Sequence, residues 1–172
     1  MTRINANKVA AVLLVGLIFG DPAEAATNTP AEIANEKLVV DFYAALDAAN
    51  STGSIAQQAR AIAERYISPD YIQHREGEGA IGNGREAFIH ATEAAPPGPV
   101  PIEMRTPAKP VALMADGDQV IIVTSRNIPN PAGGTRPVFI FNLFRIVNGK
   151  LAEHWDALPS GLMPPPGASG PR

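Results

Sequence analysis

The amino-acid sequence predicts an α+β domain in which helices precede an antiparallel sheet. Apolar residues recur at helical spacing through residues 30–66, whereas from Pro101 onward Val, Ile and Phe follow a period of two. Two dipeptides typical of tight hairpins, Asp116-Gly117 and Asn148-Gly149, interrupt the second half of the chain. Helices followed by a run of strands form the α+β pattern rather than the alternating α/β one.

The first two helices are expected from their start signals. Residues 29–32 are Thr-Pro-Ala-Glu, so threonine can cap the helix, proline takes the first helical position and glutamate closes a capping box. The apolar stripe that follows continues to about Ala49. Ser54 and Gln57 offer a second capping box, and Ser-Pro-Asp at residues 68–70 is expected to stop that helix.

A short extended segment at 71–74 and a third helix over 84–94 are expected next, and Pro-Pro-Gly-Pro at 96–99 marks a linker. A longer Pro- and Gly-containing loop is expected at 129–137. Four strands of the sheet are predicted near residues 102–114, 119–128, 137–147 and 150–158.

The N-terminal residues predict an export signal. Arg3 and Lys8 precede an uncharged stretch of eleven residues at 9–19, and Ala-Glu-Ala at 23–25 offers small residues for cleavage after Ala25. An uncleaved membrane anchor is the alternative, but a spanning helix needs about 20 apolar residues. We therefore expect a secreted or periplasmic protein with no membrane contact after cleavage.

Composition limits the possible functions of the 172-residue chain. The predicted organisation is a signal peptide at 1–25, one domain at 26–158 and a disordered Pro/Gly-rich tail at 159–172. A net charge of -3 gives no reason to expect nucleic acid as a partner, and the absence of cysteine excludes disulfides and thiolate chemistry.

Neither a metal nor a cofactor is expected. The three histidines, His74, His90 and His154, lack the paired spacing of a metal site. The glycine-rich run at 77–84 follows no long strand, so it fits a loop at a pocket mouth better than a nucleotide cradle.

Three segments carry a resemblance to a known family: YIQH at 71–74, GREAF at 84–88 and FNLFRIVNGKLAEHWD at 141–156. Over about residues 31–158 the chain resembles the SnoaL-like branch of the nuclear transport factor two-like superfamily. The resemblance implies a cone, in which a strongly curved antiparallel sheet and two to three N-terminal helices enclose a pocket. Members include polyketide cyclases, isomerases, hydrolases and binding modules.

Two positions depart from the resembled cyclases. Where they carry an acid/base aspartate, two residues before the Phe-Arg pair, this chain has Asn142. Where a histidine is usual in the preceding strand, it has Val123. A protein that binds a ligand without turnover is therefore a real alternative to an enzyme.

The Asn148-Gly149 turn predicts which side chains share a face. A two-residue loop places Asn142 opposite Trp155. If Asn142 lies in the pocket, as the resemblance implies, Trp155 lies there too unless a bulge shifts the register. The outer face would then carry Arg145, His154 and Asp156. Because the resemblance implies that this face commonly makes the dimer contact, we expect a homodimer.

The predicted ligand is a small apolar carbonyl compound. His74 is the favoured base because a neutral imidazole can accept a proton near pH 7, and Asn142 would donate a hydrogen bond to the enolate oxygen. The reaction would be a cofactor-free aldol cyclisation or isomerisation. A histidine that only holds its strand, a non-catalytic pocket and a protein-interaction module are the alternatives. The residues expected to contact the ligand are Tyr71, Val123, Phe144 and Trp155.

Overall fold

The computed structural model describes residues 27–75, 82–100, 105, 110–130 and 132–157, which form three helices and five strands. The predicted signal peptide, the predicted tail and most of the expected strand at 102–114 lie outside these residues. Within the described part of the chain, no helix combines the length and apolar character needed to cross a membrane.

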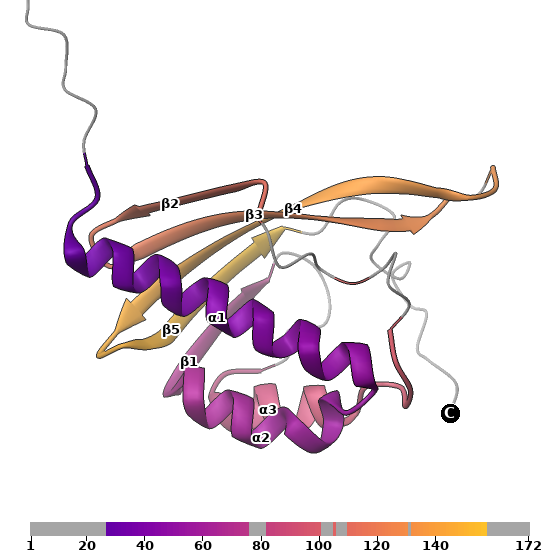
Figure 1. Ribbon diagram of the computed structural model, residues 1–172. Helices are drawn as coiled ribbons and strands as arrows, with labels where there is room; N and C mark the ends of the chain where they lie inside the picture. The colour runs from indigo at the N-terminus through magenta and orange to yellow at the C-terminus, as the bar shows by residue number, and fades with distance from the viewer. Residues whose placement is uncertain (1–26, 76–81, 101–104, 106–109, 131, 158–172) are drawn as a thin grey trace, which may run out of the picture.

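The five strands form one curved sheet in the order β1-β5-β4-β3-β2 (Figure 1). Strand β1 pairs with β5 in parallel and every other neighbouring pair is antiparallel, so the sheet is mixed rather than wholly antiparallel. The strands are β1 (Ile67–Arg75), β2 (Ala112–Asp116), β3 (Gln119–Pro129), β4 (Thr135–Val147) and β5 (Lys150–Ala157).

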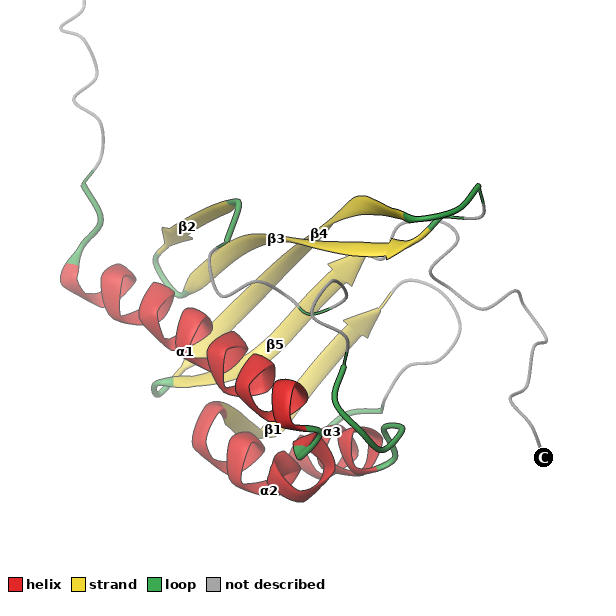
Figure 2. Cartoon of the chain, turned by 45° about the vertical axis from the view of Figure 1, so that its right-hand side comes forward, coloured by secondary structure: helices red, strands yellow, loops and turns green. Residues whose placement is uncertain are grey.

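The helices lie on one side of this sheet (Figure 2). Helix α1 (Pro30–Thr52) crosses the face of the sheet, while α2 (Ile55–Tyr66) and α3 (Arg85–Glu93) lie side by side next to β1. Phe42 of α1 joins the layers, because its ring contacts the rings of Tyr66, Phe88 and Phe144. The predicted α+β architecture with a curved sheet is confirmed.

Helix α1 begins as the sequence predicts. Thr29 caps it, and the side chains of Thr29 and Glu32 each accept a hydrogen bond from the other's backbone amide. Gly53 caps its C-terminal end, with a φ of 70° in the left-handed conformation that glycine adopts without strain. The Val100 amide donates to the Asn50 carbonyl oxygen, so the linker after α3 lies against the end of α1.

The start of α2 differs from the prediction. The Ser54 side chain does not cap the helix; its hydroxyl instead accepts a hydrogen bond from the Gln58 side chain. The helix ends at Tyr66, just before residues 68–70 as expected, and β1 begins at Ile67 and continues through them. The pairing of β1 with β5 shifts register between Ile67 and Ile72, which accommodates Pro69 in the strand.

A bulge in β5 overturns the predicted face assignment. The Asn148-Gly149 turn forms with positive φ at both residues, and Val147 pairs with Lys150 as expected. The register then shifts by one residue between Arg145 and Ile146. Beyond this point Asn142 lies opposite Asp156, so the expected pairing of Asn142 with Trp155 is wrong. Because side chains alternate along a strand, one extra residue exchanges the two faces of the rest of β5.

Candidate functional site

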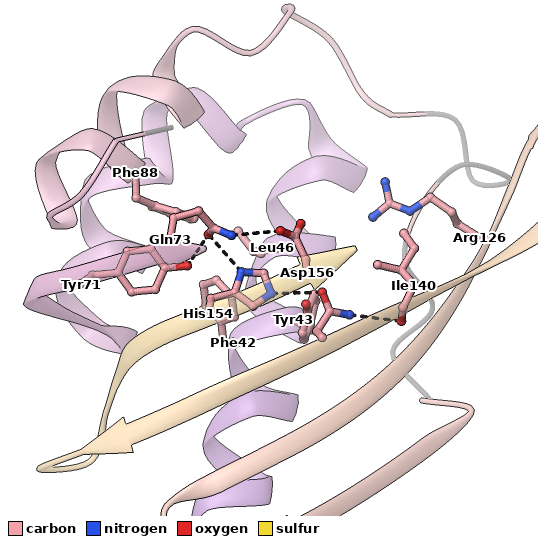
Figure 3. A pocket seen from close by; sticks show the side chains of 11 residues that line it. Phe42, Tyr43, Leu46, Tyr71, Gln73, Phe88, Arg126, Ile140, His154 and Asp156 are labelled. Carbon is pink, nitrogen blue, oxygen red and sulfur yellow. Dashed lines mark hydrogen bonds between the residues drawn. The ribbon is translucent and has the colours of Figure 1, made fainter. Parts of the chain in front are cut away.

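A cavity of about 300 Å³ lies between the helices and the sheet (Figure 3). This volume is at the lower end of the range found for small-molecule sites. All four longer strands and two helices contribute side chains to it: Phe42, Tyr43, Leu46, Tyr71, Gln73, Phe88, Arg126, Ile140, Asn142, His154 and Asp156.

The cavity wall has an apolar side and a polar side. Helices α1 and α3 supply aromatic and aliphatic groups, among them Phe42, Leu46 and Phe88, whereas the sheet supplies most of the polar groups. An apolar wall with a few converging polar groups is typical of a site that orients a small ligand by hydrogen bonds.

Gln73 occupies the centre of the polar side. Its Oε1 accepts a hydrogen bond from the Tyr71 hydroxyl at 2.6 Å and lies 3.0 Å from Nδ1 of His154. Its Nε2 donates to Oδ1 of Asp156 at 3.1 Å. A single amide therefore connects a phenol, an imidazole and a carboxylate, as the dashed lines in Figure 3 show.

Asn142 completes the network from β4. Its Nδ2 donates to the backbone carbonyl oxygens of Ile122 and Ile140 at 3.4 and 3.3 Å, and its Oδ1 lies 3.1 Å from Nε2 of His154. The His154 ring stacks on Phe144 with a centroid distance of 4.2 Å and an interplanar angle of 4°. The imidazole is thus fixed at both nitrogens and on one face.

Two side chains of opposite charge line the cavity. Asp156 is only 8% exposed, and Arg126 of β3 lies in the same wall. Burial raises the pKa of the Tyr43 hydroxyl, and the Asp156 carboxylate raises it further, while Arg126 acts in the opposite direction. Tyr43 therefore keeps its proton at neutral pH and presents a neutral hydroxyl group.

The predicted site residues divide between the two faces of the sheet. Tyr71 and Asn142 line the cavity, and Phe144 lies beneath His154, almost fully buried. The remaining three, His74, Val123 and Trp155, are not among the residues that line the cavity.

His74 and Trp155 lie together on the outer face. Their rings stack at 4.4 Å, and Nε2 of His74 is 2.8 Å from Oε2 of Glu153. Arg145 donates to the other carboxylate oxygen of Glu153. Hydrogen bonds from His74 and Arg145 hold the pKa of Glu153 below its ordinary value. The polar cluster on the outer face is therefore His74, Glu153 and Arg145.

His154 and Asp156 were expected on that outer face, and this expectation is wrong. Both line the cavity because the β5 bulge reverses the alternation of β5 between Leu151 and Glu153. Val123 follows the ordinary alternation of β3 and pairs with Phe141, whose side chain is 61% exposed on the outer face.

Gln73 and Arg126 are the cavity residues that sequence reasoning missed. Gln73 is two residues from Tyr71 on the same strand, so alternation alone places both on one face. Arg126 likewise lies two residues from Thr124, a buried residue of β3, so both side chains are on one face. Polar side chains in phase with buried neighbours are the available signal for both.

Among the described residues, no group of three His, Asp or Glu side chains is arranged so that it could hold a metal ion.

Comparison with known proteins gives matches in structure alone. No family model matches the chain, and no curated protein matches it. A candidate SnoaL-like polyketide cyclase from Jannaschia sp. CCS1 aligns with a TM-score of 0.55 at 15% identity, over 77% of this chain and 90% of that one. An NTF2-like protein of unknown function from Burkholderia pseudomallei aligns with a TM-score of 0.51 at 15% identity, over 73% and 91%. The fold is nuclear transport factor two-like.

The same fold carries different chemistry in other proteins. An epoxide hydrolase from Mycobacterium tuberculosis described as LEH-like aligns with a TM-score of 0.51 at 15% identity, over 75% of this chain and 81% of that one. Cyclases, hydrolases and proteins of unknown function thus share the nuclear transport factor two-like architecture. At this identity the likeness shows the fold and assigns no activity.

Proposed function

We propose that the cavity binds a small, largely apolar carbonyl compound and catalyses proton transfer at the carbon next to the carbonyl group, with Asp156 as the base. The observation that carries this proposal is the buried Asp156 carboxylate, which Gln73 orients in a cavity whose opposite wall is apolar. A SnoaL-like aldol cyclisation or isomerisation is the finer form of the same proposal.

Asp156 is suited to the role of base by its surroundings. The hydrogen bond from Gln73 to Oδ1 fixes the orientation of the carboxylate, and burial limits competing water. In the proposed step a proton leaves the carbon for the carboxylate, and the C–H electron pair moves into the carbonyl group to form an enolate. The guanidinium of Arg126 in the same wall would stabilise the developing oxyanion.

The enolate then has two outcomes that need no cofactor. Return of the proton from Asp156 to a different carbon completes an isomerisation. Attack of the enolate carbon on a second carbonyl group of the same molecule completes an aldol cyclisation, in which Asp156 gives its proton to the new alkoxide.

This proposal replaces the roles that the sequence suggested for two residues. His74 lies across the sheet from the cavity, where it contacts Glu153 and Trp155. The Asn142 amide nitrogen donates to two backbone carbonyl oxygens, so its hydrogens are directed away from a ligand. We assign Asn142 to the support of His154 instead.

Deuterium exchange tests the proposal directly. Cyclic ketones and 1,3-diketones that fit the cavity are incubated with protein in D₂O, and exchange next to the carbonyl group is followed by NMR. Asp156→Asn should lower the exchange rate by about 10²–10⁴-fold, the usual contribution of a general base. His74→Gln is the matched control and should keep the wild-type rate.

Two results would contradict this assignment. Equal rates for wild type and Asp156→Asn would remove Asp156 from the reaction, and loss of exchange in His74→Gln alone would restore His74 as the base. A wild type that binds these ketones without any exchange would favour the alternative function, a non-catalytic small-molecule carrier, for which Asn142 in place of the cyclase aspartate is the supporting observation.

Export is proposed from the N-terminal sequence, with residues 1–25 as the cleaved signal and a secreted or periplasmic location. N-terminal sequencing of protein purified from its producing cell should begin near Ala26. A chain that begins at Met1 in the membrane fraction would contradict this.

A further inference from the structure

Both ring nitrogens of His154 face oxygen atoms that accept hydrogen bonds. Nδ1 is 3.0 Å from Oε1 of Gln73, and Nε2 is 3.1 Å from Oδ1 of Asn142. A neutral imidazole carries one N–H group and one acceptor nitrogen, so it can satisfy only one of these two contacts.

The two amides cannot simply be turned over to present their NH₂ groups. Gln73 directs its Nε2 at the Asp156 carboxylate, which only accepts hydrogen bonds when ionised. Asn142 directs its Nδ2 at the carbonyl oxygens of Ile122 and Ile140, which also only accept. Their own partners therefore fix both oxygens toward His154.

We propose that His154 is held as an imidazolium by Gln73 and Asn142, and that this cation adapts the cavity to a ligand or intermediate with one negative charge on oxygen. The ligand class is an enolate or the anion of an acidic 1,3-dicarbonyl compound. The inference deepens the proposed function of the same cavity and rests on it for the nature of the ligand.

The surroundings of His154 are consistent with a cation. One face of the ring stacks on Phe144, and a cation over an aromatic face is stabilised by the ring's quadrupole. The charged and titratable groups that share its cavity are Asp156 on β5, Arg126 on β3, Tyr43 on α1 and Tyr71 on β1. With Arg126 and His154 positive, Asp156 negative and both tyrosines neutral, these side chains carry a net charge of one positive unit.

Nitrogen-15 NMR of the side chains tests the charge state without any ligand. The chain has three histidines, His74, His90 and His154, so the signals of His154 are few enough to assign. At about pH 7.5, above the ordinary imidazole pKa of ~6.5, we expect both nitrogens of His154 to carry protons. One unprotonated nitrogen on His154 at this pH would overturn the proposal.

A variant isolates the cause of the charge. Asn142→Leu removes the acceptor at Nε2, so at the same pH we expect His154 to convert to a neutral ring. The matched control, Asn127→Leu at an exposed position of β3, should leave the spectrum of His154 unchanged. A doubly protonated His154 in Asn142→Leu would show that the amide does not hold the charge.

Ligand selectivity tests the consequence. Dimedone, a cyclic 1,3-diketone that is largely ionised at neutral pH, is compared with isophorone, a neutral cyclic ketone of similar size. We expect wild-type protein to bind dimedone at least about tenfold more tightly and His154→Gln to lose about tenfold of that preference. Equal binding of the two probes by the wild type would overturn the ligand assignment. Neither measurement involves turnover, so failure of deuterium exchange with the dimedone preference intact would refute Asp156 catalysis alone.

Discussion

Replacement of Gln73 by methionine should be among the most destabilising single changes in the cavity wall. Methionine keeps the length of the side chain but removes both polar ends. The carboxylate of Asp156 then loses the hydrogen bond from the Gln73 amide, while the Tyr71 hydroxyl and Nδ1 of His154 lose their contacts with the Gln73 oxygen. A neutral hydrogen bond contributes about 0.5–1.5 kcal/mol and one to a charged group about 1.5–3 kcal/mol, so loss of these three contacts should lower the free energy of unfolding by about 2.5–6 kcal/mol.

Urea denaturation followed by circular dichroism measures this loss, and Gln58→Met is the matched control. The Gln58 side chain makes one exposed hydrogen bond to Ser54, so its replacement should cost no more than about 0.5 kcal/mol. Equal midpoints for the two variants would refute the reasoning, because they would show that the Gln73 network adds nothing to stability.

A double-mutant cycle separates the hydrogen bond between Gln73 and Asp156 from general loss of packing. In an Asp156→Leu background the carboxylate that accepts this hydrogen bond is absent. Gln73→Met should therefore cost less there, by about 1.5–3 kcal/mol, the range for hydrogen bonds to charged groups. Strictly additive effects would show that the 3.1 Å contact between the two residues carries no energy.

Three further predictions concern the rest of the molecule. Gly53→Ala should destabilise more than Gly117→Ala in urea denaturation: both have positive φ, but only at Gly53 would a Cβ lie 2.7 Å from the linker backbone. Glu153→Gln should reduce the loss of unfolding free energy on acidification. The lowered pKa of Glu153 in the folded protein stabilises the fold above its unfolded pKa of about 4.3, and this contribution is lost as pH falls through the folded pKa. We propose that a homodimer forms through the outer face, where Met114, Ile121, Phe139 and Phe141 are exposed. Phe141→Glu should dissociate it in sedimentation measurements, and a wild-type monomer would contradict it.

The elements that the sequence predicts best are those with a complete local signal. The capping box at Thr29 and Glu32 and the turn at Asn148-Gly149 form as expected, since each depends on residues that are neighbours in the chain. The second capping box fails for a physical reason. At Ser54 the hydroxyl is already engaged with the side chains of Thr52 and Gln58, so it does not bond to the backbone of the first turn.

Long-range pairing was less accessible from the sequence. The segment after α2 was expected to be short and extended, but its role as a nine-residue edge strand depends on parallel pairing with β5, far away in the chain. Proline at position 69 favours a break on local grounds, and only the register shift opposite β5 shows how the strand continues through it. A pairing partner remote in sequence leaves no local pattern to read.

The candidate site depends on one residue that carries no polar group. Ala152 is the extra residue of the β5 bulge, and it decides whether Trp155 and Glu153 or His154 and Asp156 face the cavity. The outer face satisfies Glu153 with His74 and Arg145, whereas the inner face satisfies His154 and Asp156 with Gln73.

In the unbulged register these partners would be exchanged. Glu153 would enter the cavity without the hydrogen bonds that His74 and Arg145 make to it on the outer face. The bulky indole of Trp155 would take space from a volume of about 300 Å³. His154 would in turn lose both of its amide acceptors to gain an exposed position. Because unpaired buried charge costs several kcal/mol while a bulge removes about one ladder hydrogen bond, the bulged register is the lower in free energy. The polar partners on both faces, more than the turn that starts the hairpin, therefore select the register and with it the site.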